Sequence, residues 1–167
     1  MADRTKVLIH LRRLSSLLEK SFREGPDGSL EGKFAAEHPD FVHYTCGIYL
    51  AGCLAFLEGE DRSYSWNKPS PTHQNFDTFT QSNPAATSFA SRGINRSNLD
   101  ALAELRNAIV HHDGNLGQNR NQNSLSMVTG ANFPGVVLSG GIARLEAPFL
   151  EFTRLATLAV RQYYGSG

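Results

Sequence analysis

Three residue types that can act together on a phosphate ester lie near the middle of the chain: Arg106, Asn107 and His111. An imidazole takes up and releases protons near neutral pH, so it can serve as general base or general acid. A guanidinium stabilises negative charge on a phosphoryl group through its planar fork of N–H donors, and a carboxamide can orient either partner. These residue types could therefore combine proton transfer with stabilisation of an anion such as a phosphate group.

These residues are expected on one amphipathic helix that runs from Ser97 to His112. Apolar residues follow the i, i+3, i+4 spacing of such a helix: Leu99, Leu102, Ala103, Ile109 and Val110. Ser97 is the expected N-cap, and Asp113-Gly114 is the expected stop signal. At roughly 100° per residue, Arg106 falls within about 20° of the centre of the apolar stripe, where an unpaired buried charge costs several kcal/mol. Packing alone would select an aliphatic residue at that position.

His111 lies one helical turn after Asn107 on the same face, so the arginine, the amide and the imidazole are predicted to line one edge of the helix. Two structural interpretations stay open. Arg106 can form an ion pair with Glu104 of another chain or with Glu146. His111 can satisfy the last carbonyl groups and the dipole of the helix.

The run 97–114 resembles the signature of the HEPN superfamily, R-x(4–6)-H, in which the residue after the arginine is usually Asn, Asp or His. Arg106, Asn107 and His111 match the shortest spacing, and His112 matches the next one as an alternative catalytic imidazole. The resemblance implies a helical bundle and an endoribonuclease built as a homodimer, with the two motif helices facing each other. It also implies a toxin or phage-defence effector, with a nucleotidyltransferase-like antitoxin or another defence-system protein as partner.

The implied reaction is attack of a ribose 2′-OH of RNA on the adjacent phosphate, with His111 as base or acid and Arg106 stabilising the pentavalent phosphate. One arginine and one histidine are too few for this reaction, whereas a symmetric pair of chains supplies two of each. The alternative function is a non-catalytic helical module that dimerises and binds a protein or nucleotide partner. Arg106 and Asn107 would then satisfy buried groups at the interface.

The composition describes one soluble domain, residues 1–167, with 40% hydrophobic and 19% charged residues and no net charge. The first segment is basic, and Arg12 and Arg13, with Arg96 further along, are candidate contacts to RNA phosphates. Cys46 and Cys53 are about 10 Å apart along a predicted helix, which exceeds disulfide reach and indicates a reducing compartment. No metal-ligand spacing, cofactor-binding loop, signal peptide or membrane span is recognised, so a cytoplasmic protein without metal or cofactor is expected.

The predicted fold class is mainly α: a HEPN-like bundle of four to five helices with a small β-hairpin before the last helix. Periodicity and turn residues predict the following helices: 5–23, 39–58, a short one within 84–92, 97–112, and one after Pro148. Strands are expected at 126–129 and 136–139, and 139–141 reads as a turn. An exposed polar loop is expected at 115–123 and a frayed tail at 165–167.

Two further features concern packing. The excursion 59–95 is rich in Ser, Asn and Pro, and its large aromatic residues are expected to anchor it to the core rather than to stack on bases: Trp66, Phe76, Phe79 and Phe89. The helix at 39–58 is apolar on all sides and should be central. Its Gly47 and Gly52 are expected to permit close approach of a neighbouring helix.

Overall fold

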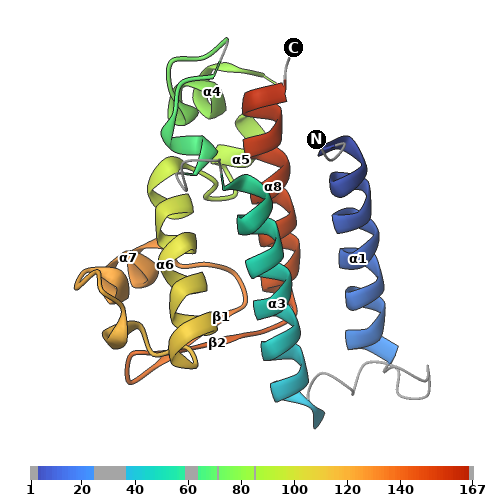
Figure 1. Ribbon diagram of the computed structural model, residues 1–167, viewed down its shortest axis with the longest axis vertical. Coiled ribbons are helices and arrows are strands. Elements are labelled where there is room, and N and C mark those ends of the chain that lie inside the picture. Colours follow the sequence, from blue (N-terminus) through green and yellow to red (C-terminus); the bar gives the residue numbers. More distant parts are fainter. Residues whose placement is uncertain (1–3, 25–36, 59–63, 71, 85, 166–167) are drawn as a thin grey trace.

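The structure is a computed structural model that describes residues 4–24, 37–58, 64–70, 72–84 and 86–165. Over these ranges the chain is mainly helical, with a two-stranded antiparallel hairpin before the last helix, as predicted (Figure 1). The long helices are α1 (Arg4–Glu24), α3 (Pro39–Leu57), α6 (Arg96–His112) and α8 (Pro148–Gly165). The shorter elements are η1 (Ser65–Asn67), α4 (Phe76–Ser82), α5 (Thr87–Ala90), η2 (Leu116–Gln118), α7 (Ser124–Ala131), β1 (Val136–Ser139) and β2 (Ile142–Leu145).

Helix α3 lies at the centre, between α6 on one side and α1 on the other, with α8 beside it (Figure 1). Gly47 is the point of closest approach to α6, because a Cβ atom there would lie 2.7 Å from Cγ2 of Ile109. The predicted role of Gly47 is therefore confirmed. For Gly52 it is wrong, since that residue is exposed and a Cβ atom would meet nothing within 4 Å.

One side of α3 faces outward although the helix carries no charged residue after Asp40. Phe41, Tyr44 and Ile48 are all exposed, Ile48 to 75%. Within the described ranges α3 is the one helix long and apolar enough to cross a membrane, and half of that stretch is buried in the protein, as a core helix is.

The excursion after α3 is anchored to the core by its aromatic side chains, as predicted. Phe76 and Phe79 are fully buried and lie 5.4 Å and 5.6 Å from the ring of Tyr163 on α8. The Tyr163 hydroxyl donates to the carbonyl of Lys68 at 2.8 Å and accepts from the amide of Ser70 at 3.1 Å. The excursion also contains α4, which the sequence analysis did not anticipate, and α5, which lies within the predicted 84–92. Residues 59–63, 71 and 85 lie outside the described residues.

The hairpin has a different first strand from the one predicted. Residues 126–129 belong to helix α7, whereas β1 pairs with β2, Val136 opposite Leu145 and Ser139 opposite Ile142. The predicted turn at 139–141 joins the two strands, and Gly140 and Gly141 both have positive φ, as a two-residue hairpin turn requires. The hairpin forms across this two-residue turn and not across the six-residue, proline-containing loop 130–135 that the prediction required.

The loop 115–123 is not an exposed loop throughout, because Leu116 is buried and Asn119 is 9% exposed. At the ends of the chain, α8 continues to Gly165, so the predicted fraying does not start there. Residues 166–167 lie outside the described residues.

Candidate functional site

Helix α6 carries the motif, and both of its ends are fixed. Its N-cap is Asn95, whose side chain accepts from the Asn98 amide at 2.9 Å, so the helix starts before the predicted Ser97. It ends at Asp113 and Gly114, as predicted, with φ of 48° and 82°. A Cβ atom on Gly114 would lie 2.3 Å from a backbone oxygen of β2, so only glycine fits here.

The segment after α6 pairs with the hairpin. The carbonyl of Gly114 accepts from the amide of Ala143 at 2.9 Å, and the Leu116 amide donates to the carbonyl of Gly141 at 3.0 Å. These bonds fix where the last turn of α6 lies relative to β2. His111 and His112, which occupy that turn, are thereby positioned by backbone contacts rather than by their own side chains.

A cavity of about 520 Å³ lies beside the C-terminal half of α6. Its lining combines one face of that helix with the segment that follows η2: Glu104, Asn107, His111, His112, Asn119, Arg120 and Asn121. Asn107 and His111 share a face, as their spacing predicts. The rings of His111 and His112 have centroids 6.2 Å apart, so both imidazoles reach the same space although they are consecutive.

Glu104 fixes the segment after η2, which lines the cavity together with α6, through hydrogen bonds. Its carboxylate accepts from the hydroxyl of Ser124 at 2.6 Å and from the side-chain amide of Asn119 at 3.0 Å. The same amide donates to the backbone carbonyl of Glu104 at 2.9 Å. Arg120, next in sequence after Asn119, is exposed and lines the cavity. Glu104 therefore has a structural role, and it brings a cation opposite the two imidazoles.

Sequence reasoning did not find Arg120, because the polar composition of 115–123 indicated a free loop. One signal was present: Leu116, an isolated large apolar residue in a polar run, is fully buried and docks the segment. A docked segment next to the motif helix would have placed Arg120 near His111.

Arg106 lies outside the lining of this cavity. A side chain five positions before His111 points about 140° away from it on a helix. Arg106 is half-buried, and its Nη2 donates to the hydroxyl of Tyr64. Tyr64 stacks on Trp66 with ring centroids 4.3 Å apart, and the Trp66 indole donates to Asp100 at 2.8 Å. Within one chain, the structure does not bring Arg106 and His111 together.

The charge of Arg106 is not balanced by a carboxylate among the described residues. Its Nε is buried and has no hydrogen-bond partner in the part of the chain that the structure describes. The ion pair with Glu146 that was considered as an alternative is not formed, and Glu104 of the same chain binds Asn119 and Ser124 instead. Among the described residues, the Tyr64 hydroxyl is therefore the hydrogen-bond partner of this guanidinium.

The outer side of the α3–α6 pair is apolar. The two helices run in opposite directions (Figure 1) and touch at Gly47 and Ile109. By helical geometry, the next residue on each, Ile48 and Val110, therefore projects to the same side. Val110 is 49% exposed, which corrects the expectation that it continues the buried stripe. We call Tyr44, Ile48 and Val110 the α3–α6 face. Arg106 and His111 flank Val110 on α6.

The basic residues proposed to contact RNA phosphates lie away from the cavity. Arg12 and Arg13 are exposed on α1, which lies across α3 from α6 (Figure 1). Arg96 is the first residue of α6, about 22 Å along the helix axis from His111 at 1.5 Å per residue. Of the described arginines, Arg120 is the one in the lining of the cavity.

The two cysteines and the potential metal ligands do not form a second reactive site among the described residues. Cys46 and Cys53 are unpaired and buried, and burial raises the pKa of their thiols to about 12 and about 11. They are therefore inert apolar residues at neutral pH. Within the described ranges, no three His, Cys, Asp or Glu side chains are grouped in a way that could hold a metal ion.

Comparisons of the chain with protein-family models, with curated proteins and with solved structures found no match. The resemblance to the HEPN signature therefore rests on the motif in α6 and its surroundings.

Proposed function

We propose that the chain is an endoribonuclease of the HEPN type, which acts as a homodimer and needs no metal ion. The observation that carries this proposal is the cavity in which Asn107, His111, His112 and Arg120 meet. Two imidazoles provide a general base and a general acid, and the arginine provides a cation for the phosphate. Transesterification of RNA uses groups of these kinds, and Arg106 of a second copy would complete the set.

In this mechanism one imidazole takes the proton of the ribose 2′-OH, and we assign that role to His111. The 2′ oxygen attacks phosphorus, and the bond from phosphorus to the 5′ oxygen breaks. A second imidazole, His112 or the partner copy's equivalent of His111, donates a proton to the leaving 5′ oxygen. The products are a 2′,3′-cyclic phosphate and a free 5′-OH. Asn107, one turn before His111, orients that ring or the phosphate.

Arg106 enters the mechanism only if a second copy completes the site, because its own chain directs it away from the cavity. No carboxylate of the described residues balances its charge, which favours such a use. The α3–α6 face supports a homodimer, since its exposed apolar side chains can pack against the same side chains of a second copy across a two-fold axis. Each cavity would then combine His111 of one copy with Arg106 of the other. An interface of roughly 1,200–2,000 Å² would be ordinary for such a dimer.

In the cell, the HEPN resemblance favours a cytoplasmic toxin or phage-defence effector, held inactive by a nucleotidyltransferase-like antitoxin. Expression of the wild-type chain alone should then slow bacterial growth, while an Arg106→Ala chain expressed to the same level should not. Equal growth with both chains would contradict this role.

The enzymatic proposal is tested with purified protein and labelled RNA in the presence of EDTA. RNA but not DNA should be cut, and the fragments should carry 2′,3′-cyclic phosphates. His111→Ala should reduce the rate by at least about a hundredfold, the contribution of a general acid or base. His10→Ala, an exposed histidine on α1, is the matched control and should keep full activity. Cleavage that persists in His111→Ala or depends on added magnesium would refute the assigned roles.

A second function, a non-catalytic helical module, is favoured by the contacts of Arg106 with Tyr64 and of Trp66 with Asp100. If Arg106 only supports this packing, the Arg106→Ala protein should lose about 1–3 kcal/mol of unfolding free energy, the cost of leaving the Tyr64 hydroxyl without its hydrogen-bond partner. A large loss of stability in a protein that cuts no RNA would support the module. Unchanged melting with lost cleavage would support the ribonuclease.

A further inference from the structure

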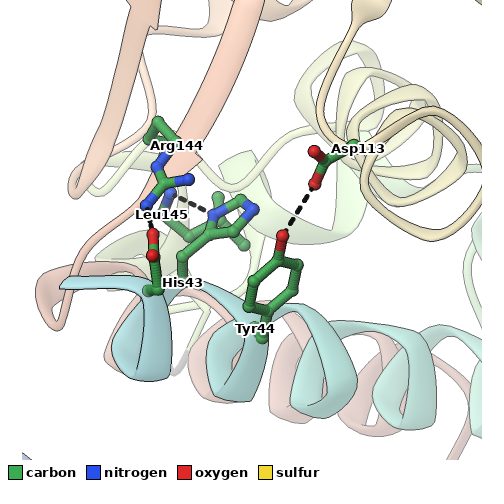
Figure 2. A network of polar contacts seen from close by, with 6 residues as sticks. His43, Tyr44, Asp113, Arg144 and Leu145 are labelled. Atoms are coloured by element: carbon green, nitrogen blue, oxygen red, sulfur yellow. Dashed lines mark hydrogen bonds and ion pairs between the residues drawn. The ribbon is translucent and has the colours of Figure 1, made fainter. Parts of the chain in front are cut away.

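His43 is a buried titratable group that the proposed reaction does not use. It lies on α3, is 1% exposed, and its Nδ1 accepts a hydrogen bond from the backbone amide of Leu145 in β2 at 3.0 Å (Figure 2). An accepting Nδ1 carries no proton, so the ring is neutral with its hydrogen on Nε2. Nε2 is also buried and has no hydrogen-bond partner among the described residues.

Two more contacts lie beside this bond (Figure 2). One joins β2 to α3 again, and the other joins α3 to the end of α6. Arg144, next to Leu145 in β2, forms an ion pair with Asp40 at the start of α3. The Tyr44 hydroxyl, next to His43, donates to the carboxylate of Asp113 at 3.0 Å, and Asp113 is the C-cap of α6. The His43 bond is the buried one of the three, while the two flanking contacts are exposed.

We propose that His43 is a proton-controlled latch between α3 and β2. When neutral, it accepts the Leu145 amide and holds the hairpin against α3. When protonated, Nδ1 becomes a donor that faces another donor, so the bond cannot persist and β2 is released. Because β2 binds Gly114 through Ala143, and the turn before β2 binds Leu116 through Gly141, release of the hairpin frees the end of α6 that carries His111 and His112.

The surroundings of His43 set the direction of its response to pH. Burial lowers the pKa of the imidazole below its usual 6.5, and the charge of Arg144 in β2 lowers it further. Asp113 at the end of α6 and Asp40 on α3 oppose this shift without reversing it. The unfolded or released form thus binds a proton more readily than the closed form. Closure is therefore fully favoured above pH 6.5 and weakens as the pH falls below that value.

This latch does not depend on the proposed ribonuclease activity, because it concerns the docking of β2 and not the chemistry in the cavity. A protein that cuts no RNA could still show it.

The test is amide hydrogen exchange of the Leu145 N–H, measured by NMR between pH 8 and pH 5 and expressed as protection relative to the unstructured chain. In the wild type, protection should fall below pH 6.5 by up to about tenfold per pH unit, the limit for one proton. His43→Asn keeps an acceptor near the position of Nδ1 and cannot titrate, so its protection should not change with pH. His10→Asn, a control for an exposed histidine, should behave as the wild type does.

A second measurement keeps the proposal testable if His43→Asn does not fold. The ring ¹⁵N signals of His43 in the wild type should show the Nε2–H tautomer at pH 8 and a titration midpoint below pH 6.5, the ordinary value for an imidazole. A His43 that titrates at or above pH 6.5 would overturn the latch. So would constant Leu145 protection through the titration of His43.

Discussion

At the scale of single residues, the two arginines near the end of α6 differ in what surrounds them. Arg106 is half-buried and bonded to Tyr64, whereas Arg120 is exposed and faces the same cavity as His111. A cation in an open cavity contributes little to folding, since exposed charges are well solvated. The role that we propose for Arg120 is to stabilise the negative charge of a bound phosphate.

Arg120→Ala should therefore lower the rate of RNA cleavage by about 10²–10³, comparable to the loss of a transition-state donor, while melting changes little. Arg13→Ala removes an equally exposed cation from α1, away from the cavity, and should leave the rate unchanged. Cleavage rates and melting temperatures of both proteins check this. Equal rates for Arg120→Ala and the wild type would exclude Arg120 from the site.

At the scale of elements, the packing of α3 against α6 decides where the motif lies. Gly47→Ala places a Cβ atom 2.7 Å from Ile109 Cγ2. It should lower the unfolding free energy by about 1–2 kcal/mol, because an overpacking cost of roughly 1–3 kcal/mol exceeds the roughly 0.5–1 kcal/mol that alanine gains over glycine in a helix.

Gly52→Ala is the matched control on the same helix, since nothing lies within 4 Å of a Cβ atom there. It should stabilise the protein by about 0.5–1 kcal/mol, the helix-propensity gain alone. Urea denaturation of the two variants measures both effects. If Gly47→Ala raises the unfolding free energy as Gly52→Ala does, the α3–α6 contact is not as close as described.

The long helices could be predicted from sequence because their apolar periodicity is strong and their ends carry turn residues. The segment 126–129 could not, because its β-branched residues favour a strand locally while Val128 is buried in the short helix α7. β1 pairs with β2 and not with residues 126–129, because Gly140 and Gly141 form a tighter turn than the predicted loop.

The candidate site was accessible to sequence reasoning only in part. Asn107 and His111 share a face because of local helical geometry, which sequence spacing determines. The place of Arg120 depends on long-range hydrogen bonds from Glu104 to Asn119 and Ser124, and no local pattern encodes these. The direction of Arg106 depends on Tyr64, forty-two residues away in sequence.

At the scale of the whole molecule, the α3–α6 face is where we expect the dimer to form. Ile48→Asp places a charge on a side chain that is 75% exposed, so it should convert the dimer into monomers of 18.3 kDa and abolish cleavage with the fold intact. Ile109→Asp is unsuitable for this test, because Ile109 is buried against Gly47 and the variant should unfold. Leu17→Asp, on the exposed side of α1, should remain dimeric. Gel filtration with light scattering distinguishes these results.

The composite site is tested most directly by mixing two inactive variants, Arg106→Ala and His111→Ala, and allowing their subunits to exchange. In a mixed dimer, one cavity lacks both groups and the other has both. With half of the dimers mixed and half of their cavities intact, cleavage should return to about a quarter of the wild-type rate, as two-fold symmetry requires. A mixture that exchanges subunits and stays as inactive as the separate variants would contradict a site shared between two copies.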